Sequence, residues 1–352
     1  MSQPIQKRLQ EVLSPYGIQP LSNIEICATS SVNEVFFVDT SRGRIALKHH
    51  IQNDSLERLK QEVALTEKLA TFGVPTAQVL LNQGGQPVTE HQNTHLYIVS
   101  EFIDGTPLPN NHKLTESQIA QLAQLLAKFH LAGVDEELQL LPTHICSYDV
   151  QGLTNRLMTY RCELHTLEQQ HSCAADLLTL IYNAMPKAMG LSRALPDELI
   201  NTCMKSIIHA DVQPSNFIFN SQDELVSCID FDHARRDLRI YDIYQLAFLA
   251  VNSKFSLTAD TAPSRESSWQ DTLELILSNY EQIAPPLNPT ERQCFVSMAE
   301  VHFLHQLADY QFDVTNDQCD ITISKLRRDM VNLEQDMAAI EQVMAGAEQA
   351  TC

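Results

Sequence analysis

The hydrophobic positions near the start of the chain alternate with polar ones. From Ile24 to Lys48 the sequence is "IEICATSSVNEVFFVDTSRGRIALK", in which β-branched and aromatic residues alternate with polar residues around two polar interruptions. A period of two residues is typical of half-buried strands. The pattern predicts two or three antiparallel strands, with a hairpin turn at Arg42-Gly43.

A helical period follows in "NDSLERLKQEVALTEKLATFGVP". Asp54 is the predicted N-cap, with Glu57 three residues on, and Gly73 and Pro75 are expected to end the helix. The apolar face of this helix is formed by Leu56, Leu59, Val63 and Leu69.

The apolar run "HLYIVSEFIDG", residues 95–105, predicts one more buried strand, which ends at Gly105. The first hundred residues are therefore expected to form a small sheet with one inserted helix. After Pro109 the pattern becomes helical, and Thr115 with Gln118 forms a predicted capping box at the start of the first helix there.

Most of the remaining chain has helical spacing of its apolar residues. The exception is residues 207–232, where the apolar runs "FIFN" and "LVSCIDFD" flank the polar "SQDE". This arrangement predicts a small hairpin. Helical patterns are expected to resume from Ile243, and there is no internal repeat or long linker.

Composition limits the class of protein and its partners. With 352 residues and 44% hydrophobic content, the chain is expected to form two subdomains around a real core. The 24 basic residues face 44 acidic ones, and the formal charge of −20 repels phosphate backbones and anionic membranes. We therefore expect no nucleic acid and no membrane as partner. A cationic or neutral small substrate is accommodated more easily.

The first residues of the chain and its cysteines indicate the cellular compartment. The start, "MSQPIQKRLQEVLSPYGIQP", lacks the apolar core of a signal peptide, and no segment approaches the roughly eighteen apolar residues of a membrane span. The nine cysteines are an odd number without a C-x-x-C pair, which is typical of reduced thiols rather than of a disulfide frame or a zinc site. A cytoplasmic protein is expected.

Three polar residues carry the candidate chemistry. Asp211 and Asn216 lie five residues apart in one loop, and Asp230 ends the next apolar run. A hairpin between them would bring all three to one rim. That arrangement suits phosphoryl transfer, in which one carboxylate accepts the proton of an attacking hydroxyl, while an amide oxygen and a second carboxylate hold magnesium on the phosphates. Each residue alone is also compatible with an ordinary turn.

The segments "HADVQPSN" and "CIDFD" resemble the catalytic and metal-binding loops of the aminoglycoside phosphotransferase and choline kinase superfamily. The family signature, His-x-Asp-x-x-x-x-Asn followed by Ile-Asp, is matched by His209, Asp211, Asn216 and Asp230. The later "YDIYQLAF" is similar to the Asp-Leu-Ala helix start of the family. The resemblance implies that Asp211 is catalytic, that Asn216 and Asp230 bind magnesium, and that His209 is structural.

The resemblance also implies a fold. It covers roughly residues 20–250 and predicts an α+β, bilobal, protein-kinase-like architecture. Residues 1–103 are expected to form a small antiparallel-sheet N-terminal lobe with one helix, which binds the nucleotide. Residues 104–352 are expected to form a larger, mainly helical lobe with the catalytic and metal-binding loops and the substrate pocket.

Nucleotide-binding residues follow from the same resemblance. Lys48 is placed like the strand lysine that contacts the α- and β-phosphates, and Glu62 like the helix glutamate that pairs with it. "SEFIDG" is similar to the hinge between lobes, where the backbone carbonyl of Glu101 and the amide of Ile103 would bind adenine. A solvated lysine, an exposed acid and a plain strand end are the alternative interpretations.

Two segments depart from the protein-kinase pattern. The phosphate-covering turn "ATSSVNEVFFV" has no glycine, although Ser31 and Asn33 match a form common among small-molecule kinases. Where protein kinases have Asp-Phe-Gly, this chain has a second acid, Asp232. It either binds a second magnesium, shapes the substrate pocket or caps a turn.

The predicted function is an ATP- and Mg²⁺-dependent kinase that transfers the γ-phosphate to a hydroxyl of a small molecule, such as an aminoglycoside, choline, ethanolamine, homoserine or a related alcohol. A Ser/Thr protein kinase of the bacterial stress-response type shares the fold. The short segment after Asp232 and the alanine at position 210 argue against it. A nucleotide-binding regulator without catalysis is the third interpretation. The sequence leaves the oligomeric state open.

Overall fold

The computed structural model describes residues 3–27, 33–51, 55–92, 95–134, 146–167, 172–254, 265–309 and 319–349. The chain divides into two compact units. Unit 1 holds the described residues up to Asn110 together with Pro214–Asp232, and unit 2 holds the other described residues. Both helices and antiparallel strands are present, so the α+β class is confirmed.

Unit 1 is built on a five-stranded antiparallel sheet with the order β1-β2-β3-β5-β4. Its strands are β1 (Pro20–Ile26), β2 (Glu34–Thr40), β3 (Gly43–His50), β4 (Val88–His91) and β5 (His95–Glu101). The predicted hairpin at Arg42-Gly43 is confirmed, and Gly43 adopts φ +107°, a conformation that favours glycine.

The strand predicted over residues 95–105 ends earlier than expected, at Glu101. The chain then turns to form the short strand β6 (Thr106–Pro107), which pairs with a different sheet. A Cβ atom at Gly105 would lie 2.6 Å from a methyl group of Ile218, so the glycine marks a close approach rather than the end of the strand.

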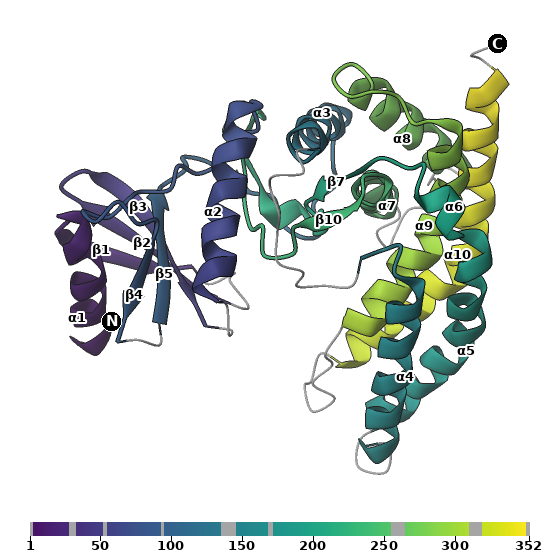
Figure 1. The fold of residues 1–352 in the computed structure, drawn as a ribbon, viewed down its shortest axis with the longest axis horizontal. Coiled ribbons are helices and arrows are strands. Elements are labelled where there is room, and N and C mark those ends of the chain that lie inside the picture. Colours follow the sequence, from purple (N-terminus) through teal and green to yellow (C-terminus); the bar gives the residue numbers. More distant parts are fainter. Residues whose placement is uncertain are drawn as a thin grey trace. The chain divides into compact units, whose positions relative to one another are not determined.

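Two helices cover the two faces of the sheet (Figure 1). The helix α1 (Gln3–Leu13) packs on the face that carries Leu47 and Val99, and α2 (Leu56–Thr71) packs on the face that carries Ile98. The expectation of one helix in this region is therefore wrong. The apolar face of α1 has the helical spacing of Ile5, Leu9, Val12 and Leu13, a signal that the sequence contains.

The ends of α2 follow local rules. Its N-cap is Ser55, whose hydroxyl accepts a hydrogen bond from the amide of Arg58 at 3.1 Å, so the predicted cap at Asp54 is one residue off. After Thr71 the chain leaves the helix through Gly73, with φ +72°. The predicted stop at this glycine is confirmed.

Unit 1 also contains the hairpin expected in residues 207–232. It consists of β8 (Phe217–Phe219) and β9 (Leu225–Cys228), which form a three-stranded sheet with β6. The amide of Cys228 donates to the carbonyl of Pro75 at 2.8 Å, which fixes the hairpin beside the segment after α2.

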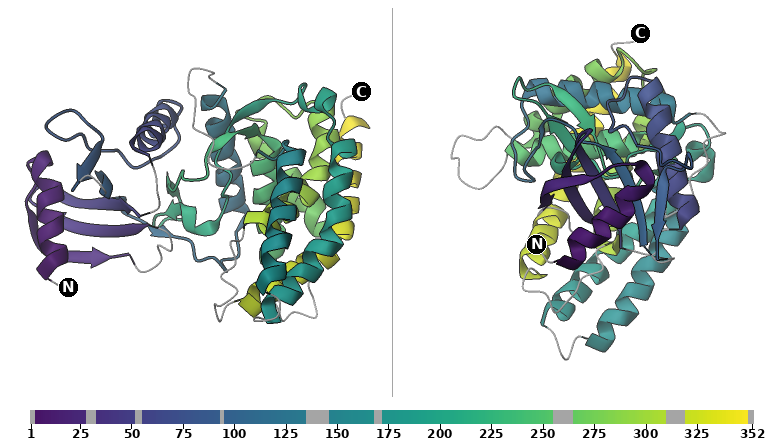
Figure 2. Two further views of the ribbon diagram at one scale, coloured as in Figure 1. Left: turned by 60° about the horizontal axis from the view of Figure 1, so that its bottom comes forward. Right: turned by 90° about the vertical axis from the view of Figure 1, so that its left-hand side faces the viewer.

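Unit 2 is mainly helical. Its helices are α3 (Glu116–Ala132), α4 (Val150–Leu167), α5 (Ser172–Ala194), α6 (Asp197–Ile200), α7 (Ile240–Lys254), α8 (Arg265–Tyr280), α9 (Pro289–Asp309) and α10 (Cys319–Gln349). Figure 2 shows α4 beside α5, and these two helices contact one another. The capping box of Thr115 and Gln118 at the start of α3 is confirmed.

A two-stranded ribbon in unit 2 was not predicted from the sequence pattern. It pairs β7 (Lys205–Ile208) with β10 (Arg235–Leu238) in antiparallel register. The helix expected from Ile243 begins at Ile240, directly after this ribbon. Four residues are too few to reveal a strand by alternation, and "RRDL" is also strongly polar.

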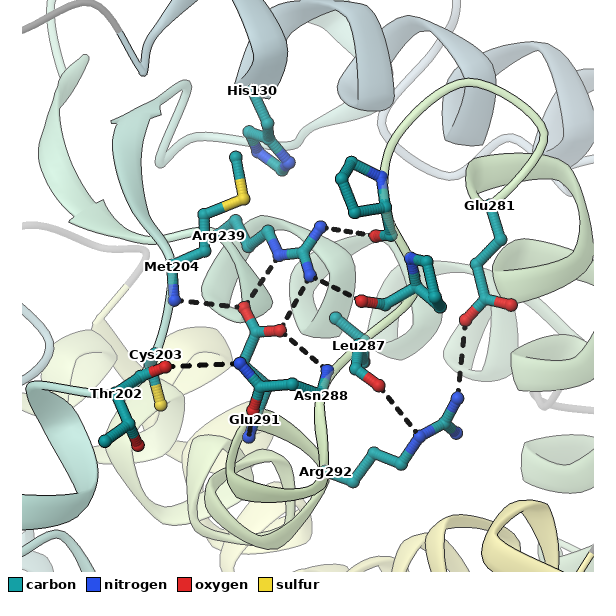
Figure 3. A network of polar contacts seen from close by, with 12 residues as sticks. His130, Thr202, Cys203, Met204, Arg239, Glu281, Leu287, Asn288, Glu291 and Arg292 are labelled. Carbon is teal, nitrogen blue, oxygen red and sulfur yellow. Dashed lines mark hydrogen bonds and ion pairs between the residues drawn. The ribbon is translucent and has the colours of Figure 1, made fainter. Parts of the chain in front are cut away.

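A buried ion pair fixes the point where β10 passes into α7 (Figure 3). The guanidinium of Arg239 binds both carboxylate oxygens of Glu291 at 2.6 and 2.7 Å and donates to the carbonyls of Pro285 and Pro286 at 2.7 and 3.0 Å. Both charged side chains are almost fully buried. This bidentate geometry anchors the start of α9 to the start of α7.

Candidate active site

The position of Lys48 follows from the alternation of β3. Lys48 lies opposite Ile98 in the register of β3 and β5, and cross-strand partners project from the same face of a sheet. Ile98 packs against Leu59 and Val63 of α2. The lysine side chain therefore projects from the sheet toward α2.

Three carboxylates surround the Lys48 ammonium. The Nζ atom lies 3.8 Å from Glu62 Oε1, 3.2 Å from Asp230 Oδ1 and 2.6 Å from Asp232 Oδ1. The predicted pairing of Lys48 with Glu62 is thus present. The structure also brings the two acids of the "IDFD" segment to the same ammonium.

The charges in this cluster depend on one another. Burial disfavours the charged form of Lys48, but Glu62, Asp232 and Asp230 outweigh burial and raise the pKa of Lys48. Burial raises the pKa of Glu62, and the nearby lysine offsets only part of that effect. Lys48 therefore stays a cation at neutral pH.

Asp232 joins the cluster to Asn33, the residue before β2. Its Oδ2 accepts a hydrogen bond from Asn33 Nδ2 at 2.9 Å, while its Oδ1 contacts Lys48. Of the two residues predicted to cover the phosphates, Asn33 is thus placed beside the lysine. Ser31 lies outside the described residues.

The proposed metal ligands Asn216 and Asp230 belong to one end of the β8–β9 hairpin. Phe217 pairs with Cys228, and the carbonyl of Asn216 accepts a hydrogen bond from the amide of Ile229 at 3.0 Å. Asn216 thus takes part in this hydrogen bond, and Asp230 lies one residue beyond it. The hairpin thus places the amide residue just before β8 and the carboxylate residue just after β9, at the same end of the two paired strands.

Oxygen ligands suitable for Mg²⁺ are available at this end of the hairpin. The Asp230 side chain is 45% exposed, so its carboxylate is accessible to a cation. Among the described residues, no three His, Cys, Asp or Glu side chains form a complete metal site by themselves. A nucleotide-bound Mg²⁺ requires only one or two protein carboxylates, because phosphates and waters complete its shell. The residues present fit that ion.

The predicted hinge lies at the end of β5. The amide of Glu101 donates to the carbonyl of Gln78 at 2.9 Å, and the amide of Phe102 donates to that of Arg44 at 3.4 Å. Ile103 follows immediately. The adenine contacts assigned to Glu101 and Ile103 use the main chain, and they stay a prediction.

The loop that carries Asp211 belongs to unit 2 and contains a strained residue. Ala210 adopts φ +64°, a left-handed conformation uncommon for residues with a Cβ atom. Asp211 follows it, and its Oδ1 accepts from Gln213 Nε2 at 2.5 Å. Backbone strain of this kind persists where the surrounding structure enforces it, commonly at functional sites.

Asp242 enforces the conformation of this loop. Its fully buried carboxylate accepts hydrogen bonds from the amides of His209 and Ala210, both at 2.8 Å, and lies 3.1 Å from His130 Nε2. Burial opposes the ionised form, but His130 and the loop amide lower the pKa of Asp242. The motif "YDIYQLAF" contains Asp242, and the aspartate that opens this helix was a usable signal for its role.

Three buried histidines, His209, His302 and His305, lie against aromatic rings. His209 is fully buried, and its ring centroid lies 5.9 Å from that of Phe129. His302 and His305 are also buried and lie against the ring of Tyr241.

The fold and the lysine cluster together define a protein of the kinase-like class. An antiparallel sheet carries the lysine, a helix on the same face carries its glutamate, and a hairpin supplies two further acids. The chain belongs to the phosphotransferase enzyme family, whose model matches residues 25–274. No helix among the described residues is long and apolar enough to cross a membrane.

Curated relatives agree with this family. A homoserine kinase of Methylobacillus glycogenes is 23% identical over 237 residues, which are 67% of this chain and 66% of that protein. A homoserine kinase of Rhodopseudomonas palustris is 28% identical over 237 residues, covering 67% of this chain and 65% of the relative. The chain thus spans about two thirds of the length of these relatives.

Solved structures share the fold. An aminoglycoside phosphotransferase from Alicyclobacillus acidocaldarius has a TM-score of 0.63 at 17% identity, with 96% of each chain covered. A spectinomycin phosphotransferase in complex with ADP and spectinomycin has a TM-score of 0.63 at 15% identity, with 97% of this chain and all of that chain covered. The expected protein-kinase-like architecture is confirmed.

Proposed function

We propose that this chain is an ATP- and magnesium-dependent phosphotransferase that moves the γ-phosphate of ATP to a hydroxyl group of a small molecule. The observation that carries the proposal is the Lys48 ammonium among Glu62, Asp230 and Asp232. A paired lysine and an accessible carboxylate are the groups that a magnesium–phosphate complex requires. Membership of the phosphotransferase family supports the same conclusion.

Unit 1 supplies the nucleotide and metal contacts. Lys48, held by Glu62, is proposed to bind the phosphates, and Asn216 and Asp230 are proposed to hold Mg²⁺. Asp232 contacts both Lys48 and Asn33, and it is proposed to keep Asn33 in place and to add an oxygen ligand. Bound Mg²⁺ would neutralise charge that develops on the transferred phosphoryl group.

Asp211 is proposed to orient the acceptor and to take its proton. As the acceptor oxygen bonds to the γ-phosphorus, the bond from phosphorus to the bridging oxygen of ADP breaks, and the hydroxyl proton passes to the carboxylate. The strained alanine before Asp211 and the Asp242 contacts fix the path of this loop. A fixed loop supports this role because misplacement of a catalytic group lowers the rate steeply.

The acceptor is proposed to be a small alcohol that carries an amino group. Several relatives are named homoserine kinases, and structures with the same fold include an aminopropanol kinase and an ethanolamine kinase. The formal charge of −20 favours the approach of cationic molecules. The names of the relatives make homoserine, a zwitterion, the first acceptor to test, and the charge makes the cationic amino alcohols the next.

The test is a coupled assay of ADP release with ATP, Mg²⁺ and a panel of homoserine, amino alcohols and aminoglycosides. The Asp211→Asn variant should bind nucleotide as the wild type does and lose phosphate transfer. An Asp211→Asn variant with wild-type turnover would refute the assignment of Asp211. Phosphorylation of casein instead of the alcohols would indicate a protein kinase, and nucleotide binding without transfer to any acceptor would indicate a regulator.

A further inference from the structure

The segment that carries the proposed metal ligands turns sharply after β9. Asp230 adopts φ +67°, in the left-handed region that residues with a Cβ atom rarely enter. Phe231 follows with a buried side chain, and Asp232 comes next. The direction of this turn decides where the two carboxylates point. A strained turn of this kind persists only where neighbouring groups hold it.

Arg58 of α2 binds the backbone of this turn. Its Nη2 atom donates to the carbonyl of Asp232 at 3.1 Å and makes a longer contact of 3.5 Å with the carbonyl of Phe231. The guanidinium thus binds the backbone of the turn, while the carboxylates of Asp230 and Asp232 contact Lys48.

Arg58 lies at a position of α2 where an arginine does not favour helix formation. It is the third residue of α2, in the first turn, where the helix dipole disfavours a cation. It is also only 5% exposed, and a buried guanidinium requires hydrogen-bond acceptors. The carbonyls of the turn supply acceptors at this place. Contact with the turn therefore accounts for an arginine here better than helix formation does.

The same helix reaches the cluster at a second point. Glu62 lies one turn after Arg58 and extends to Lys48 at 3.8 Å. We infer that Arg58 is a positioning residue for the proposed phosphotransferase reaction: it holds the Phe231-Asp232 backbone so that the Asp230 and Asp232 carboxylates face the lysine and the metal. This inference rests on the proposed function. It couples the position of α2 to the metal ligands through the backbone as well as through the Lys48–Glu62 pair.

The test compares Arg58→Met, which removes all donors, with Arg58→Lys, which keeps a charge and a donor. The control is Lys60→Met, two residues along α2, where a side chain faces a different direction. The affinity of a fluorescent ADP analogue is measured with Mg²⁺ and with EDTA. Loss of a group that orients metal ligands weakens metal affinity about tenfold or more, so the Mg²⁺-dependent affinity of Arg58→Met should fall by about that factor.

The expected result has a distinct signature. For Arg58→Met, the nucleotide affinity in EDTA should change by less than about twofold, and excess Mg²⁺ should restore nucleotide binding. The Mg²⁺-dependent affinity of Arg58→Lys should be intermediate, and that of Lys60→Met should match the wild type. A variant Arg58→Met that binds nucleotide as the wild type does, or that loses affinity equally with and without Mg²⁺, would overturn the inference. If Arg58→Met does not fold, Arg58→Lys decides the matter by the same two affinities. A wild-type chain that neither binds nucleotide nor transfers phosphate would overturn the proposed function, and the inference with it.

Discussion

Asp242 offers the sharpest test of how the Asp211 loop is held. Its carboxylate receives three contacts, with Oδ1 accepting from Ala210 and Oδ2 accepting from His209 and facing His130. In an Asp242→Asn variant one of these oxygens becomes an NH₂ group. In either orientation that group faces at least one backbone N–H, so at least one buried donor loses its acceptor.

The size of the effect follows from those contacts. A hydrogen bond to a charged group contributes about 1.5–3 kcal/mol, and an unsatisfied buried donor costs about 1–3 kcal/mol. Breaking a buried charged pair by removing one partner costs about 3–5 kcal/mol, which agrees with the sum of those two terms. We therefore expect Asp242→Asn to lower the free energy of unfolding of unit 2 by about 3–5 kcal/mol and to lower kcat, because the Asp211 loop loses its anchor.

Urea denaturation followed by circular dichroism measures this change, with the exposed Asp271→Asn variant on α8 as control. The control should stay within about 0.5 kcal/mol of the wild type. Because the folded pKa of Asp242 is lowered, its stabilisation is present above the unfolded value of about 4 and is lost as the pH falls through the folded value. A loss below about 1 kcal/mol at pH 7.5, or an unchanged acid sensitivity in the variant, would refute this reasoning.

Three further predictions concern unit 2. Burial lowers the pKa of His302 to about 3, so stability should fall by about 2 kcal/mol from pH 7.5 to 5 as the unfolded histidine takes up a proton; His302→Phe should remove that loss in urea titrations at both pH values. A Gly133→Ala Cβ would lie 2.6 Å from the Ile207 amide, and the overpacking should cost about 1–3 kcal/mol and lower the Tm. The Glu291→Gln variant leaves Arg239 buried without its charge partner, so it should lower the free energy of unfolding by about 3–5 kcal/mol and lower the Tm. An unchanged Tm of the Gly133→Ala or the Glu291→Gln variant would contradict the prediction for that variant.

The parts of the site that depend on local pattern could be predicted from the sequence. Alternation along β3 and the helical period of α2 predicted the elements that carry Lys48 and Glu62, the family resemblance predicted their pairing, and the hairpin signal brought Asn216 near Asp230. These relations depend on the period of a strand or helix and on short turns. The sequence carries both directly.

The supports of the site depend on contacts between distant segments, which no period encodes. Arg58 binds backbone carbonyls that lie 173 and 174 residues further along the chain, and Asp242 binds amides 32 and 33 residues before it. A carbonyl or an amide is present at every position, so residue types alone do not identify the partner. Local signals predicted Asp54 rather than Ser55 as the cap of α2, since both residue types cap helices well.

The composition of unit 1 has a consequence for synthesis of the chain. Unit 1 is completed by Pro214–Asp232, which the ribosome adds long after Asn110. At about 5–20 residues per second, translation from Asn110 to Asp232 takes roughly 6–24 s. During that interval Lys48 and Arg58 lack the partners that this later segment supplies, and β6 lacks its partner strand β8. Unit 1 therefore stays incomplete, and open to chaperones and to misassociation, until this segment has been made.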